Sequence, residues 1–123
     1  KQIKKHKKEM WEYIKKYLKS KKEFEVRFAV VIILDFYLDE EYIESVLEIL
    51  SKVNHEGYYA KMAVAWAYSL CFIKFYEKTK EKFNKTDKEK TDKFIYNKSI
   101  QKALESYRLN NNQKEELKKM KIK

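Results

Sequence analysis

The chain has 123 residues, enough for one domain with a modest core and too few for two, and 39% of them are charged. One glycine, no proline and an aromatic content of 15% exclude a hairpin-rich β protein and a disordered chain, so the composition predicts an all-α fold. The net charge of +10 favours a polyanionic partner, although only two of the 29 basic residues are arginines, and such lysine-rich usage is also typical of AT-rich coding.

The spacing of apolar residues predicts a first amphipathic helix over residues 3–19, in which Trp11 packs against the second helix. After a turn at residues 20–22, residues 23–37 form a second helix that is apolar nearly all round, which predicts a buried central element. Asp39 is the predicted N-cap of a third helix over residues 40–53. Gly57, the only glycine, suits a turn that requires positive φ.

A fourth helix is predicted from about residue 58 to residue 83, with one stripe formed by Tyr59, Met62, Ala63, Trp66 and Leu70. Residues 84–92 are polar and form a surface loop, and a fifth helix covers residues 93–107. Three asparagines at residues 110–112 end this helix before a short basic helix over residues 113–121. The pattern predicts five to six helices in a single domain over residues 1–123.

Two segments resemble each other at an offset of 34 residues, VRFAV over residues 26–30 and AKMAV over residues 60–64. A weaker third copy begins near residue 97. Helix pairs that repeat at about this period are typical of α-solenoids, and the consensus of tetratricopeptide repeats is missing, so we expect HEAT-like repeats. In such a stack the equivalent side chains of Arg27 and Lys61 would point from the same edge.

The residue types give no sign of a metal or cofactor site. His6 lies in a lysine run and His55 in a predicted turn, and neither has a partner at metal-ligand spacing. Cys71, the only cysteine, lies in an apolar stretch and predicts a small buried side chain in a reduced, cytoplasmic setting. For Asp35, within the apolar second helix, a structural hydrogen bond is favoured over catalysis. No segment is apolar and long enough to span a bilayer, so no membrane partner is expected.

Two residues stand out as candidate binding residues. Arg27 is the only arginine before residue 108, and a guanidinium at this place favours a bidentate or stacked contact that lysine cannot make. The alternative for Arg27 is an ion pair with Glu23 or Glu25. Trp66 is flanked by two alanines, which favours a position in the core over a ring presented to a ligand.

Three segments carry a resemblance to a known family: EVRFAVVIILDFYLDEEYI over residues 25–43, HEGYYAKMAVAWAYSLCFIKF over residues 55–75, and FIYNKSIQKALESYR over residues 94–108. They are similar to the AlkD-like DNA alkylation repair enzymes, which are bacterial alkylpurine DNA glycosylases. The resemblance implies a HEAT-like α-solenoid of which this chain is the C-terminal portion, truncated at its N-terminus. It also implies a cytoplasmic enzyme that is monomeric at full length.

The resemblance implies a basic face that holds duplex DNA containing alkylated purines. It implies hydrolysis of the N-glycosidic bond of cationic N3- and N7-alkylpurines, without a deep pocket for a flipped base. Arg27 matches the family's site arginine and Trp66 its second site tryptophan, so both are expected to act in catalysis and in DNA binding. Lys61, as the repeat equivalent of Arg27, and Lys98 are expected to contact phosphates.

The family's catalytic aspartate and its companion tryptophan match no segment of this chain, so we expect this portion alone to be inactive. Two alternatives remain open. One is a non-catalytic paralogue that binds structured DNA, and the other is a HEAT-like protein-interaction scaffold whose charge reflects only genomic bias.

Overall fold

The computed structural model describes the backbone of residues 2–122 and the side chains of residues 5–122. This part of the chain forms seven helices and no strand, which confirms the all-α prediction. None of these helices is long and apolar enough to cross a membrane. In chain order they are α1 (Gln2–Leu18), α2 (Glu23–Phe36), α3 (Ile43–Leu50), α4 (Tyr58–Lys74), α5 (Tyr76–Lys85), α6 (Lys93–Leu104) and α7 (Asn111–Met120).

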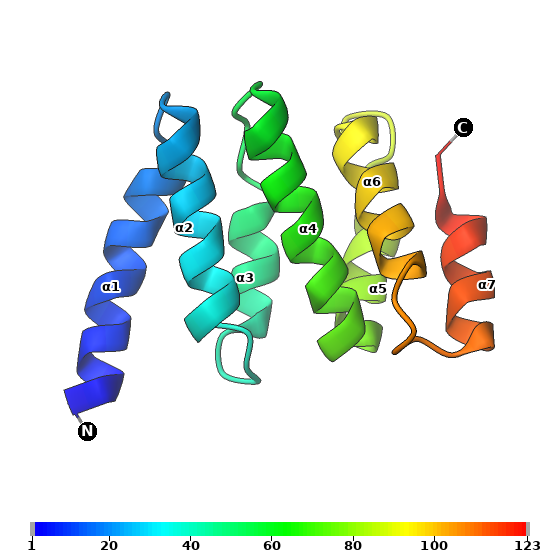
Figure 1. The fold of residues 1–123 in the computed structure, drawn as a ribbon, viewed down its shortest axis with the longest axis horizontal. Helices are drawn as coiled ribbons and strands as arrows, with labels where there is room; N and C mark the ends of the chain where they lie inside the picture. The colour runs from blue at the N-terminus through cyan, green and yellow to red at the C-terminus, as the bar shows by residue number, and fades with distance from the viewer. Residues whose placement is uncertain (1, 123) are drawn as a thin grey trace.

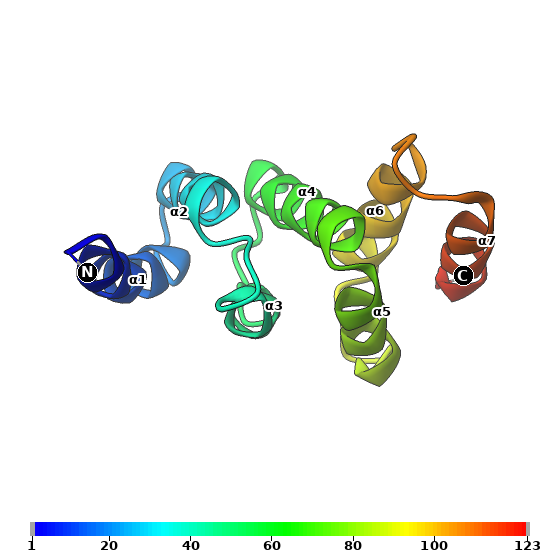
Figure 2. The ribbon, with the colours of Figure 1, turned by 90° about the horizontal axis from the view of Figure 1, so that it is seen from below.

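The helices follow one another along the long axis of the molecule, from α1 at one end to α7 at the other (Figure 1). Seen at right angles to that view, α2, α4 and α6 form one layer, and α3 and α5 lie below it in the picture (Figure 2). The helix α4 packs against its neighbours in both layers, namely α2, α3, α5 and α6. The layer of α2, α4 and α6 therefore leaves one face of three adjacent helices uncovered.

The central buried element is α4, whereas the sequence pattern predicted α2. Buried residues point from α4 in nearly every direction, and many are alanines, whose small side chains let neighbouring helices approach closely. In α2 the buried residues are limited to one stripe, and four large apolar residues on other sides are exposed. The apolar residues of α2 therefore lie on two sides of the helix, one packed in the core and the other exposed.

The predicted fourth helix over residues 58–83 is broken in two at Phe75, whose φ of −136° and ψ of 63° leave the helical region. Neither glycine nor proline marks this break. The turn lets α5 fold back on α4, so that the Phe83 ring lies 5.0 Å from Tyr68 and 4.7 Å from Phe72, measured between ring centroids. Tertiary packing of aromatic rings explains the break, and it raises the helix number from the predicted five or six to seven.

A polar junction joins the N-terminal ends of α2 and α4. The Glu23 carboxylate accepts a hydrogen bond of 2.9 Å from the backbone N–H of Ala60. His55 accepts a bond from the Gly57 N–H through Nδ1, so its Nε2 donates to the Lys21 carbonyl oxygen at 2.8 Å. Gly57 has a φ of −64°, so the predicted need for positive φ is wrong. A Cβ at this position would collide with the Glu23 carboxylate that bonds the Ala60 N–H, so glycine fits there.

Side-chain caps define several helix ends close to the predicted places. Asp39 accepts a 2.9 Å hydrogen bond from the Tyr42 N–H, but it caps a turn that precedes α3 rather than α3 itself. Asp92 caps α6 by accepting from the Ile95 N–H at 3.1 Å. Asn110 forms a capping box at the start of α7. At the other end of the molecule, Trp11 is buried as expected and packs on aromatic rings just beyond α2.

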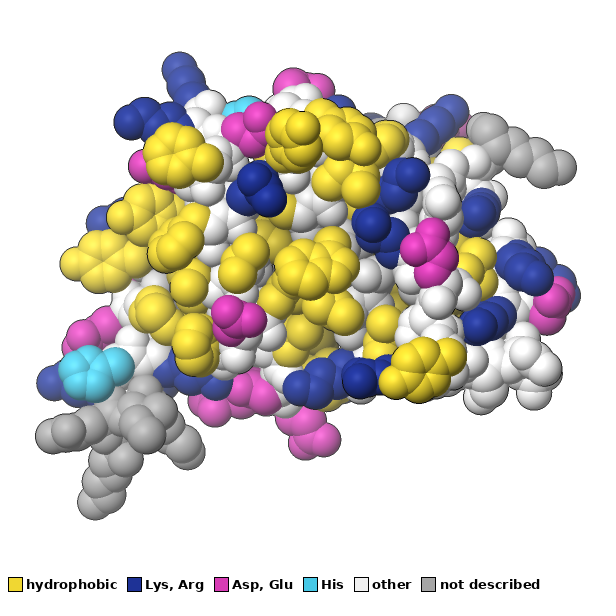
Figure 3. Space-filling model, viewed as in Figure 1, with side chains coloured by type: hydrophobic (Ala, Val, Ile, Leu, Met, Phe, Trp, Pro, Cys, Tyr) yellow, Lys and Arg dark blue, Asp and Glu magenta, His cyan; other side chains and the backbone are white. Residues whose placement is uncertain are grey.

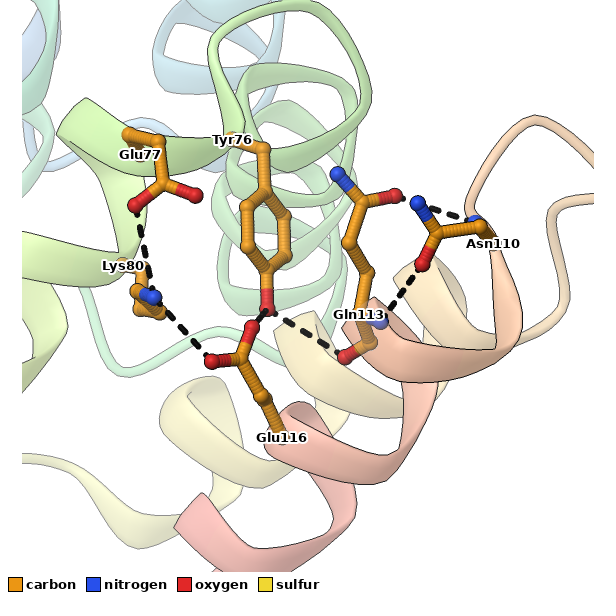
Figure 4. Close-up of polar contacts among 6 residues, drawn as sticks. All are labelled: Tyr76, Glu77, Lys80, Asn110, Gln113 and Glu116. Carbon is orange, nitrogen blue, oxygen red and sulfur yellow. Dashed lines mark hydrogen bonds and ion pairs between the residues drawn. The ribbon is translucent and has the colours of Figure 1, made fainter.

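The terminal helix α7 is held to α5 by a small polar network (Figure 4). The Tyr76 hydroxyl donates to the Glu116 carboxylate at 2.7 Å and lies 3.2 Å from the Gln113 carbonyl oxygen. Lys80 Nζ lies 3.3 Å from the second oxygen of Glu116. Beneath these contacts Leu117 is fully buried. Burial and the bond to Glu116 raise the pKa of the Tyr76 hydroxyl above its ordinary value.

Candidate nucleic-acid interface

Exposed hydrophobic side chains are concentrated on the layer formed by α2, α4 and α6. Of the eleven large hydrophobic side chains that are exposed in the described part of the chain, eight belong to these three helices, and α3, α5 and α7 contribute none. We call these eight the aromatic face: Phe24, Phe28, Val31, Phe36, Tyr58, Tyr59, Trp66 and Phe94. A large exposed apolar surface on a folded domain is typical of a binding site.

Figure 3 shows this side of the molecule. Hydrophobic side chains gather over α2 and α4, and lysine or arginine side chains lie among them and over α6. The surface is therefore mixed, with apolar rings and cations side by side. Such a combination suits a partner that offers both flat apolar groups and negative charge.

Arg27 lies exposed on α2, and its Cζ atom is 5.6 Å from the centroid of the Tyr59 ring on α4. The alternative role in an ion pair is not seen, because both candidate carboxylates have other partners. Glu23 bonds the Ala60 N–H, and Glu25 accepts from the Ser20 hydroxyl. The guanidinium thus lies over an aromatic ring, and its positive charge is uncompensated among the described residues.

The contact between Arg27 and Tyr59 is the first link of a continuous row. The Tyr59 ring centroid lies 5.4 Å from that of Tyr58, and the Tyr58 ring lies 5.9 Å from Phe94 on α6. Lys98 Nζ in turn lies 5.7 Å from the Phe94 ring centroid. These five residues, which we call the cation–aromatic row, cross all three helices of the layer with one cation at each end.

Trp66 lies on α4 with 44% of its surface exposed, so the predicted core position is wrong. It follows Tyr59 by two helical turns and therefore belongs to the same side of α4. Both neighbouring alanines, Ala65 and Ala67, are fully buried and hold this stretch of the helix in the core while the indole ring faces outward. Arg27 and Trp66, the two residues singled out by the resemblance, are thus both exposed on adjacent helices of one layer.

Lys61 has a different environment from its repeat equivalent Arg27. Its Nζ lies 2.9 Å from Asp92 and 3.2 Å from Glu56, and its side chain is only 20% exposed. Hydrogen bonds to these two carboxylates raise the pKa of Lys61. A phosphate at this position would have to displace them, so the equivalence of Arg27 and Lys61 in the sequence does not extend to their surroundings. Among the side chains of residues 5–122, Lys98 bonds only that of the neutral Gln101, at 3.4 Å.

The remaining candidates lie outside the aromatic face or make no contacts of note. Asp35 is exposed on α2, and the structural hydrogen bond expected for it does not occur with any described residue. His6 is exposed, as expected from its lysine-rich surroundings. Within residues 5–122, no cluster of histidine, cysteine and acidic side chains could hold a metal ion.

Sequence reasoning missed Tyr58 and Phe94. A signal was present, since every second helix has an exposed aromatic residue in its first turn: Phe24 in α2, Tyr58 and Tyr59 in α4, and Phe94 in α6. An aromatic residue at a helix start is ordinary by itself, and only the layering of these helices places the rings together.

In comparisons, no protein-family model, no curated protein and no solved structure matches the chain.

Proposed function

We propose that this chain is the C-terminal, DNA-holding portion of an alkylpurine DNA glycosylase of the AlkD-like family. In this proposal the seven helices are part of a HEAT-like solenoid, and the aromatic face is turned toward duplex DNA. The observation that carries the proposal is the position of Arg27 and Trp66. Both match site residues of the family, and both are exposed on the same layer of helices.

Each of the two residues has chemistry suited to this task. The Arg27 guanidinium can donate to two phosphate oxygens at once, which fixes the DNA next to the lesion. The Trp66 ring can attract positive charge over its face. Hydrolysis of an N7-alkylguanine breaks the bond between C1′ and the base, which leaves as a neutral molecule while positive charge develops on the deoxyribose. Water then adds to C1′ and releases a proton.

This portion is expected to bind DNA without appreciable turnover, because the carboxylate that stabilises the sugar cation in the family has no counterpart in the matched segments. Asp35 is an exposed carboxylate of α2, but it has no equivalent among the family's site residues that we matched. Excision of N7-methylguanine by the chain would therefore contradict our expectation that this portion has no catalytic carboxylate.

The test is binding to a fluorescein-labelled duplex that contains one N7-methylguanine, followed by fluorescence anisotropy at low salt. We expect Arg27→Lys to weaken binding several-fold, because lysine offers neither the fork of donors nor the same stacking on Tyr59. Arg108→Lys is the matched control, since Arg108 is the other arginine, is exposed, and lies outside the α2, α4 and α6 layer. Equal affinity of both variants would contradict the role of Arg27.

Trp66→Ala should weaken binding as well, with Tyr13→Ala as its control. Tyr13 is an exposed ring on α1, outside the aromatic face. If none of the proteins binds DNA at low salt, the proposed function is wrong, and the exposed apolar surface favours the alternative of a protein-interaction scaffold.

A further inference from the structure

We propose that the cation–aromatic row binds an unpaired nucleotide, so that the protein prefers DNA with an extrahelical base over an intact duplex. This inference rests on the proposed function and adds to it the kind of DNA that is recognised. It concerns Arg27, Tyr59, Tyr58, Phe94 and Lys98, of which only Arg27 and Lys98 were expected to contact DNA.

The three aromatic rings of the row are exposed to solvent. Tyr58 and Tyr59 are 59% and 60% exposed, and Phe94 is 38% exposed. An intact duplex buries the faces of its bases in the stack and presents phosphates and sugars, so it offers these three rings no base on which to stack. Every unpaired base, in contrast, has a free π-face that stacks on an aromatic side chain without regard to sequence.

One cation lies at each end of the row, Arg27 above Tyr59 and Lys98 above Phe94. Neither forms an ion pair with a described carboxylate, in contrast to Lys61. Each uncompensated cation lies next to an exposed ring, where it can contact a phosphate beside a base that stacks on that ring.

The same charges argue against other occupants of this surface. An apolar protein partner would bury two cations without a carboxylate to pair with them, which is costly. A second copy of the chain would bring one net charge of +10 against another. A polyanion with flat apolar groups satisfies both the rings and the cations, and an unpaired stretch of nucleic acid has this chemistry.

The experiment compares two labelled DNAs that differ only in a short unpaired bulge, with anisotropy as the readout. We expect the bulged duplex to bind about fivefold more tightly or better, the ratio that corresponds to stacking of one base. Tyr59→Ala should abolish this preference, and Tyr59→Phe should retain it. Tyr13→Ala is the matched control, because Tyr13 is also 60% exposed and has a lysine ammonium 5.6 Å from its ring centroid.

A second measurement tests whether the unpaired base stacks on the cation–aromatic row. With 2-aminopurine in the bulge, stacking on the row should change its fluorescence on binding to wild-type protein but not to Tyr59→Ala. Equal affinity for bulged and intact duplexes would overturn the inference and leave the proposed function standing. Equal loss of affinity for both DNAs in Tyr59→Ala would also overturn it. Failure to bind either DNA would refute the inference and the proposed function together.

Discussion

Asp92 offers a direct way to test the packing that surrounds the candidate interface, because its carboxylate makes two separable contacts. One oxygen accepts the Ile95 N–H at 3.1 Å and caps α6, and the other lies 2.9 Å from Lys61 Nζ. Asp92→Ala removes both contacts. Asp92→Ser removes the ion pair but keeps a side-chain oxygen that can cap the helix.

The two contacts are of similar size. Loss of an N-cap costs about 1 kcal/mol, and a partly exposed ion pair contributes at most about 1 kcal/mol. We therefore expect the free energy of unfolding to fall by about 2 kcal/mol in Asp92→Ala and by about 1 kcal/mol or less in Asp92→Ser. For a chain of this length, a change of 1 kcal/mol shifts Tm by about 4 °C.

Urea unfolding followed by circular dichroism measures the free energy of unfolding of each variant. The values can be compared if the dependence of this free energy on urea concentration, the m-value, is unchanged. Lys61→Met removes the ion pairs with Asp92 and Glu56 but keeps the cap, and it should therefore resemble Asp92→Ser. Equal losses in Asp92→Ala and Asp92→Ser would refute the cap. The serine variant also tests function, since it partly releases Lys61. If Lys61 contacts phosphate as expected from the sequence, Asp92→Ser should bind DNA more tightly than wild type.

Three further predictions concern stability and reactivity. Leu117→Ala should lower the free energy of unfolding by about 2–5 kcal/mol, because this side chain of α7 is fully buried, and a cost below about 1 kcal/mol in urea unfolding would show that α7 is not docked. Burial raises the pKa of the Cys71 thiol to about 12, so labelling with a disulfide reagent at neutral pH should be slow until urea unfolds the protein; fast labelling of the folded chain would place Cys71 outside the core. Burial opposes ionisation of Asp39 and Asp92, but hydrogen bonds from lysine and backbone donors outweigh it and hold the pKa of both below the ordinary value of about 4. A lowered pKa in the folded state stabilises the protein above the unfolded value, so stability should fall as pH drops below about 4, and an unchanged urea midpoint across that range would contradict these contacts.

The helices that could be predicted from the sequence are those with local signals. Apolar spacing located α1, and the polar stretches over residues 84–92 and 110–112 separated the last helices close to where α6 and α7 begin. These signals act within one or two helical turns, so they do not depend on the rest of the fold. The break at Phe75 has no local signal, because it results from rings of α5 packing back on α4.

The candidate site was only partly predictable for the same reason. Arg27 was identified because it is an arginine in a lysine-rich chain, and its exposure agrees with a role outside the core. The row that it belongs to is formed by residues up to 71 positions apart, from Arg27 to Lys98. The environment of Lys61, unlike that of Arg27, could not be predicted from the sequence. Its partner Asp92 lies 31 positions away, and no local pattern reveals that the charge of Lys61 is already paired.

The central claim is that the layer of α2, α4 and α6 binds DNA, and the salt dependence of binding tests it most directly. The measurement is the Kd for a labelled duplex with one N7-methylguanine, determined by anisotropy over a series of salt concentrations. If Arg27 and Lys98 each neutralise one phosphate, log Kd should rise with log salt with a slope of about 2, and Arg27→Ala should reduce this slope by about 1. Absence of saturable binding at low salt, or an affinity independent of salt, would contradict the claim.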